Sequence, residues 1–74
     1  MLVKSWGKEC RNIRKQEPGE TTYTVADVAG EKLFQIQTYG SSERKAKGTV
    51  NQTIQFTREQ VVELVEILKR EMNV

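Results

Sequence analysis

Cations that flank an aromatic ring are the most chemically suggestive feature of this chain. The stretch KSWGK places Trp6 between Lys4 and Lys8, and RNIRK, residues 11–15, follows shortly after it. Single-stranded nucleic acid is held by cations along its phosphates and by rings on which bases stack, at about 1–3 kcal/mol per base. The pattern therefore predicts a polyanion-binding surface. The alternative for Trp6 is a place in the core, where a sole tryptophan commonly packs.

A second group of cations lies in the polar loop YGSSERKAKGTV, residues 39–50, which separates two strand-like runs. Arg44, Lys45 and Lys47 accompany one carboxylate there, just as residues 1–16 carry five cations and one carboxylate. Such segregation creates a field that steers polyanions. Ordinary solubility also demands a charged surface, so both readings stay open.

The residues that usually perform catalysis are missing or isolated. The chain has no histidine and one cysteine, Cys10, and Ser41 and Ser42 have no base to activate them. The carboxylates show no acid–base pairing or metal-ligand spacing, and the glycines form no phosphate-binding fingerprint. We expect no enzyme activity, no cofactor, no metal and no small-molecule substrate.

The length of 74 residues predicts a single domain, residues 1–74, with a small core. A chain of this size hides only about 60 % of its unfolded surface, and neither a disulfide nor a zinc site can supplement its core. Self-association is the remaining way to stabilise so small a core, so we expect a homodimer. The lone thiol suits a cytoplasmic protein, and neither a signal peptide nor an apolar run of about 18 residues is evident.

The last segment, TREQVVELVEILKREMN, predicts a helix over residues 57–72. Thr57 is its N-cap candidate, and Gln60 completes a capping box. Its apolar stripe is broader than one sheet requires, which predicts two contacts: its own sheet and a second copy of the chain. Alternatively, the outer members of the stripe are boundary residues packed under loops. The predicted dimer interface comprises Val62, Leu64, Ile67 and Leu68.

Period-two alternation before the helix predicts an antiparallel sheet of four or five strands. Its clear strands fall within residues 22–56. Residues 1–21 form a basic extended segment, in which residues 1–16 supply one or two further strands. A tight hairpin turn centres on Gly30. The fold class is α+β, with the C-terminal helix packed on one face. The other face is uncharged and able to hydrogen-bond, which suits a polymer, although threonine also has good strand propensity. It carries Thr22, Thr24, Gln35, Gln37, Tyr39, Thr53 and Gln55.

The string YTVADVAGEKLFQIQTYG…RKAKGTVNQTIQFTREQVVELVEILK resembles the single-stranded-DNA-binding domain of the transcriptional coactivator positive cofactor four and its small bacterial and phage relatives. The resemblance covers residues 22–72. It implies a curved antiparallel sheet followed by a helix, a dimer through the helices, and single-stranded DNA running over the sheets and basic loops. The chain departs from the family beside the turn, where Val28, Ala29 and Glu31 replace an aromatic residue and lysines.

These features together predict a non-catalytic binder of single-stranded nucleic acid, DNA rather than RNA, associated with transcription or replication. The alternative is a protein–protein interaction module, an accessory subunit or an inhibitor, that binds no nucleic acid. In the first case cations meet phosphates, Tyr39 and Trp6 stack on bases, and Gln35 and Gln37 contact base edges. The predicted binding residues are Lys4, Trp6, Lys8, Arg11, Arg14, Lys15, Gln35, Gln37, Tyr39, Arg44, Lys45 and Lys47.

Overall fold

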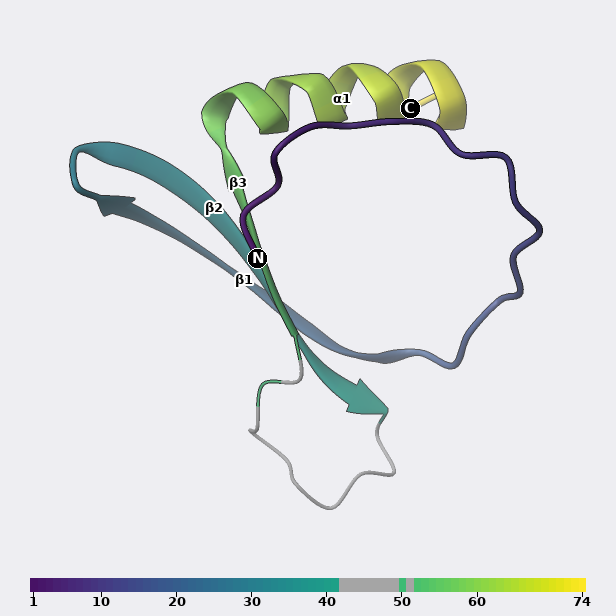
Figure 1. The fold of residues 1–74 in the computed structure, drawn as a ribbon. Helices are drawn as coiled ribbons and strands as arrows, with labels where there is room; N and C mark the ends of the chain where they lie inside the picture. The colour runs from purple at the N-terminus through teal and green to yellow at the C-terminus, as the bar shows by residue number, and fades with distance from the viewer. Residues whose placement is uncertain (42–49, 51) are drawn as a thin grey trace.

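A three-stranded antiparallel sheet and one helix form the fold, in a computed structural model that describes residues 1–41, 50 and 52–74 (Figure 1). The strands β1 (Gly19–Val28), β2 (Glu31–Ser41) and β3 (Gln52–Thr57) lie in the order β1-β2-β3, and α1 (Arg58–Met72) follows β3 directly. The fold is α+β with a C-terminal helix. The expectation of four or five strands is wrong, because the described part of the chain forms three.

The missing strands were expected in the first residues of the chain, which have no sustained period-two alternation. Residues 1–18 contribute one isolated parallel bridge, between Leu2 and Gln55, and no strand. Beyond that bridge the segment bonds to α1 instead, and residues 9–18 are all exposed. Without a buried face to fix its register, a segment of this kind gains little from joining a sheet.

The register of the sheet separates two chemically different faces. Tyr23 pairs with Ile36, which pairs with Ile54, and the next row joins Val25, Phe34 and Phe56. Directly opposite residues share a face, so these rows form one apolar side, as the alternation predicts. The intervening rows are polar and lie on the other side; they join Thr24 to Gln35 and Gln55, and Thr22 to Gln37 and Thr53.

A two-residue turn closes the β1–β2 hairpin at the predicted place. Ala29 and Gly30 have φ angles of 52° and 80°. Positive φ at both central residues is the geometry that matches the twist of the flanking strands. Gly30 adopts it freely, whereas Ala29 carries a Cβ that disfavours it.

Helix α1 begins with half of the expected capping box. Thr57 is extended and its hydroxyl accepts a hydrogen bond from the Gln60 backbone N–H at 3.3 Å. The Gln60 side chain does not return to Thr57; its Nε2 donates to the Lys4 carbonyl oxygen at 3.1 Å. The helix ends at Met72 and is capped by Asn73, whose left-handed conformation is typical of a helix terminus.

Residues 1–8, which we call the strap, first run beside the outer edge of β3 (Figure 1). The Met1 amino group donates to the Thr53 carbonyl oxygen at 2.7 Å. Val3 N–H donates to the Gln55 carbonyl oxygen, and Gln55 N–H donates to the Met1 carbonyl oxygen, both at 2.8 Å. The strap therefore covers part of an edge that would otherwise be open to other chains.

The strap then follows α1. Trp6 Nε1 donates to the Gln60 carbonyl oxygen at 3.2 Å, and Lys8 Nζ lies 3.1 Å from the Glu71 carboxylate. Gln60 Oε1 is buried here with no hydrogen-bond partner among the described residues. An unpaired buried acceptor lowers the free energy of unfolding by about 1–3 kcal/mol. Residues 9–18, the arc, then lead from the end of α1 back to β1 (Figure 1).

The core of the isolated chain is very small. Phe56, 4 % exposed, is the only buried residue among those described. The accessible surface is 6901 Å², against about 4,700 Å² for a compact monomer of this mass. The radius of gyration is 14.4 Å, against about 11 Å for a compact chain of this length. The exposed side chains include large apolar ones such as Ile13, Tyr23 and Val62, so a single copy leaves much apolar surface in water.

Candidate nucleic-acid interface

Side-chain hydrogen bonds cross the polar face of the sheet in one continuous series, which we call the glutamine relay. Gln55 Nε2 donates to Gln35 Oε1 at 2.8 Å, and Gln35 Nε2 donates to Gln37 Oε1 at 2.8 Å. Gln37 Nε2 donates to Thr22 Oγ1 at 2.8 Å, and Thr22 Oγ1 lies 3.2 Å from the Tyr39 hydroxyl oxygen. The relay joins β3, β2 and β1.

The strand register brings these side chains together. Gln55 lies directly opposite Gln35, and Gln37 lies directly opposite Thr22. Gln35 and Gln37 are two residues apart on β2 and so share a face, as does Tyr39 two residues further. Tyr39 reaches Thr22 diagonally, a separation that an aromatic side chain can span. The period-two alternation of the sequence predicted that these side chains share a face. It does not indicate the hydrogen bonds between them.

The relay leaves hydrogen-bonding capacity for a ligand. Each glutamine amide has two N–H groups and two acceptor positions on its oxygen, and the relay uses only part of them. Thr22 is exposed, and Gln35, Gln37, Tyr39 and Gln55 are half-buried against one another. The result is an ordered, uncharged surface of amides and hydroxyls, which complements the edges of unpaired bases.

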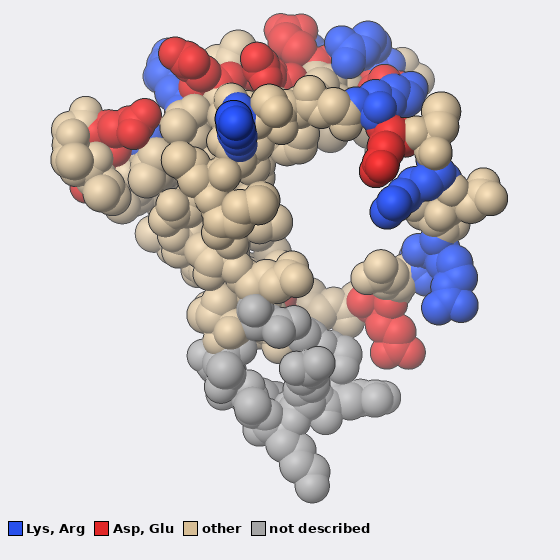
Figure 2. Space-filling model, viewed as in Figure 1, with Lys and Arg blue, Asp and Glu red and all other residues tan. Residues whose placement is uncertain are grey.

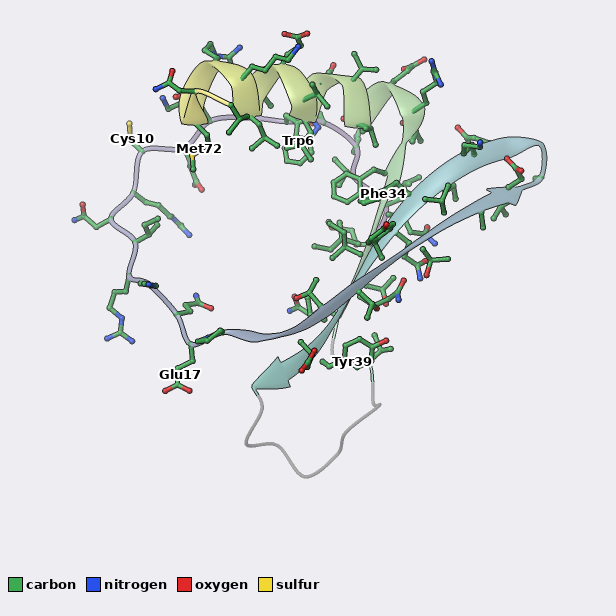
Figure 3. The ribbon with its side chains drawn as sticks, turned by 180° about the vertical axis from the view of Figure 1, so that it is seen from behind. Trp6, Cys10, Glu17, Phe34, Tyr39 and Met72 are labelled. Atoms are coloured by element: carbon green, nitrogen blue, oxygen red, sulfur yellow. The ribbon has the colours of Figure 1, made fainter. Side chains whose placement is uncertain are left out.

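The apolar face holds a matching series of aromatic rings. Tyr23 stacks on Phe34 with centroids 5.5 Å apart, Phe34 lies 6.0 Å from Phe56, and Phe56 stacks on Trp6 at 6.0 Å. Figure 3 shows Trp6 below the helix, with Phe34 beside it and Tyr39 at the far end of the sheet. The structure therefore places the two predicted stacking residues, Trp6 and Tyr39, apart and on opposite faces.

The N-terminal cations lie on the side of the sheet toward which α1 extends. Lys4 and Lys8 belong to the strap, and Lys8 is paired with Glu71. Arg11 lies in the arc, with its Nε 3.7 Å from the Glu9 carboxylate, and the arc also carries Arg14 and Lys15. Figure 2 shows lysine and arginine side chains strung along the helix and the arc. The described cations of residues 1–16 thus do not gather on the polar face.

The loop cations Arg44, Lys45 and Lys47 lie outside the described residues. The stretch that contains them connects the end of β2 to the start of β3. Tyr39 lies two residues before Ser41, the last residue of β2, so it is the member of the relay nearest to that connection along the chain.

The predicted dimer residues divide between two sides of α1. Leu64 and Ile67 are half-buried, and Ile67 lines a shallow hollow together with Trp6. Val62 and Leu68 are 55 % and 40 % exposed. Exposed apolar residues continue at Val65 and Met72, which the predicted interface omitted. With the half-buried Val61 they complete a stripe, the outer stripe, at the four-three-four spacing of helix pairs: Val61, Val65, Leu68 and Met72.

Two other features are absent from residues 1–41, 50 and 52–74, namely a cluster of metal ligands and a membrane-spanning helix. No group of three His, Cys, Asp or Glu side chains there could hold a metal ion. No helix within that part of the chain has the length and apolar character needed to cross a membrane.

The chain matches no family model, no curated protein and no solved structure. The resemblance to the coactivator family stays a prediction made on the residues alone.

Proposed function

We propose that this protein binds single-stranded nucleic acid without catalysis, DNA rather than RNA, as a homodimer in the cytoplasm, in transcription or replication. The observation that carries the proposal is the glutamine relay, which presents uncharged amides and hydroxyls across all three strands. Unpaired bases offer complementary donors and acceptors on their exposed edges.

A single strand fits this surface better than a duplex does. Duplex readers insert a helix or a two-stranded ribbon into the major groove. The one described helix, α1, has an inner side occupied by the strap and an apolar outer stripe, neither of which suits a groove lined with polar base edges. Unpaired bases need no insertion and can lie across an open sheet.

The proposed dimer covers the outer stripe of α1. The accessible surface exceeds that of a compact monomer by about 2,000 Å². A standard interface covers about 800 Å² on each partner, so a second copy accounts for a substantial part of the excess. Four-three-four spacing allows two copies of the stripe to interdigitate about a twofold axis.

We assign the phosphate contacts to the cations that the sequence places in the loop, because those of residues 1–16 lie on the helix side. Salt dependence of binding tests this role, because log affinity falls against log salt with a slope of about −0.7 per phosphate contact on a single strand. Replacing Arg44, Lys45 and Lys47 with glutamine should flatten the slope by about two units. The matched control replaces three arc cations, Arg11, Arg14 and Lys15, whose place on the helix side predicts a change below about one unit.

The test of the function itself is a comparison of labelled single-stranded and duplex oligonucleotides by fluorescence anisotropy across a salt series. We expect binding to the single strand at low salt, weaker binding to the duplex, and a dimeric molar mass in solution. Absence of binding to the single strand at low salt would remove the proposal.

One observation favours the alternative, a protein-interaction module. The edge strand β1 exposes Tyr23, Val25 and Val28, at 70 %, 52 % and 54 %. A partner strand could pair with this edge and cover those side chains. This function predicts no retention on single-stranded DNA and an α1 surface that stays exposed in a monomeric protein.

A further inference from the structure

We propose that the Tyr39 hydroxyl is a specificity-determining donor that selects bases carrying a carbonyl oxygen: thymine, uracil, cytosine or guanine over adenine. The proposal rests on the proposed function and adds a base preference to it. It also changes the role of Tyr39 from a ring that only stacks to a group that reads base edges.

The hydrogen bonds of the relay run in one direction. An amide nitrogen can only donate and an amide oxygen can only accept, so the bonds from Gln55 through Gln35 and Gln37 to Thr22 all point one way. Each bond polarises the next, which strengthens donation at the receiving end of a hydrogen-bonded series. The relay therefore makes the Thr22 hydroxyl a better hydrogen-bond donor.

The Thr22 hydroxyl proton has the Tyr39 hydroxyl oxygen as its acceptor. The Thr22 and Tyr39 hydroxyl oxygens are 3.2 Å apart, and either could donate to the other. Continuing the direction of the relay, Thr22 donates and Tyr39 accepts. The single hydroxyl proton of Tyr39 is then not used within the relay and remains for a ligand.

The Tyr39 hydroxyl proton suits an uncharged acceptor atom on the ligand. The relay itself carries no charge, and the proposed function gives the phosphates to the loop cations, so the base is the part of the strand that meets the relay. A base edge is uncharged and carries carbonyl oxygens and N–H groups, as an amide does. Its carbonyl oxygen is the matching acceptor for a hydroxyl donor, whereas adenine has no carbonyl oxygen and offers only ring nitrogens as acceptors.

The place of the pair suits access by a base. Thr22 is exposed on the edge strand β1, and Tyr39 is half-buried near the end of β2. Figure 3 shows Tyr39 at the end of the sheet remote from the helix. A strand lying over the polar face reaches this hydroxyl without displacing α1 or the strap.

The experiment compares affinities for oligo-dT and oligo-dA of equal length by fluorescence anisotropy. Tyr39→Phe removes the hydroxyl and keeps the ring, and should lower the dT-to-dA affinity ratio about fivefold, the usual worth of one neutral hydrogen bond, with less than twofold change for oligo-dA. Tyr23→Phe removes the other tyrosine hydroxyl, on the apolar face, and should leave the ratio unchanged. Self-stacking of oligo-dA belongs to the oligonucleotide and cancels when the ratio is compared between variants.

Variants of Thr22 test the relay. Thr22→Val removes the anchoring hydroxyl in a side chain of the same shape, and should lower the ratio by less than Tyr39→Phe does, with no added loss in the double variant. Thr22→Ser keeps the hydroxyl and should retain the ratio.

An unchanged ratio in Tyr39→Phe, which includes an equal loss of affinity for both oligonucleotides, or a larger effect of Thr22→Val than of Tyr39→Phe would each overturn the inference. Both outcomes leave the proposed function standing. Failure of the unaltered protein to bind either oligonucleotide would instead overturn the proposed function, and this inference with it.

Discussion

The two faces of the sheet carry two continuous series of side chains, each crossing all three strands, made from opposite chemistry. On one face the contacts are between rings, and on the other they are hydrogen bonds. The apolar series continues beyond the sheet into the strap, whereas the polar series ends within the sheet. The members are Tyr23, Phe34, Phe56 and Trp6 on the first face, and Gln55, Gln35, Gln37, Thr22 and Tyr39 on the second.

The difference shows which face needs covering. Burying apolar surface stabilises a protein by about 25 cal/mol for each Å² removed from water. The apolar series ends at Tyr23, which is 70 % exposed and so leaves such surface uncovered. Amides and hydroxyls exchange bonds with water at little net loss, so the polar face can remain open until a ligand arrives. The helix side is thus suited to permanent partners and the polar face to reversible ones.

The largest expected effect comes from removing the one side chain that is buried among the described residues. Phe56→Ala should lower the free energy of unfolding by about 3–5 kcal/mol, because Trp6 and Phe34 both lose their central neighbour. Urea denaturation followed by circular dichroism measures it. The matched change on the other face, Gln55→Ala, should lower it by about 1 kcal/mol. Equal losses for the two variants would contradict the division into a packed face and an open one.

The next effect concerns the outer stripe of α1. Leu68→Glu places a charge in the proposed interface and should weaken dimerisation at least about 30-fold, the size expected for a central apolar contact. Light scattering across a concentration series reads the molar mass. Glu66→Gln, on the opposite side of the helix, serves as the control and should leave the dimer intact. A dimer unaffected by Leu68→Glu would place the contact elsewhere.

Trp6 sharpens the comparison, because its ring and its N–H make separate contacts. Trp6→Phe keeps a ring against Phe56 but loses the bond to the Gln60 carbonyl oxygen, which should lower the free energy of unfolding by about 1 kcal/mol. Affinity for single-stranded DNA should change less than twofold, since Trp6 lies on the apolar face. A large loss of affinity with unchanged stability would assign Trp6 to the binding site.

The smallest stability effect belongs to the centre of the relay. Gln35→Met keeps the length of the side chain and removes two hydrogen bonds on a wet surface, so the free energy of unfolding should fall by less than about 1 kcal/mol. Affinity for a single strand should fall severalfold. The control, Gln52→Met, changes an exposed glutamine of β3 outside the relay.

Period-two and helical patterns predicted much of this fold. They located the helix from its cap at Thr57, the hairpin turn at Gly30, and the shared faces of β2 and β3, because each depends on neighbours close in sequence. The strand count was wrong because residues 1–8 are positioned by distant partners: Gln55, Gln60 and Glu71 bond to the strap across more than fifty residues. No local pattern contains that information.

The candidate site was predicted only in part, because it too depends on contacts between residues that are distant in sequence. Alternation placed Gln35, Gln37 and Tyr39 on one face, but the relay depends on the register with β1 and β3. The place of Trp6 against Phe56 follows from the strap, which no pattern in KSWGK indicates. Val65 and Met72 could have been found in the sequence, because their spacing with Leu68 is visible in it.

The most direct test of the polar face as the binding site is a nuclear magnetic resonance titration of the side-chain amides with a short oligo-dT. The account predicts that the Gln35, Gln37 and Gln55 amide signals shift as the oligonucleotide is added. The Gln60 amide, which bonds to the strap beneath α1, should stay in place in the same spectra. Shifts confined to Gln60 and the helix, with the three relay amides unmoved, would contradict it.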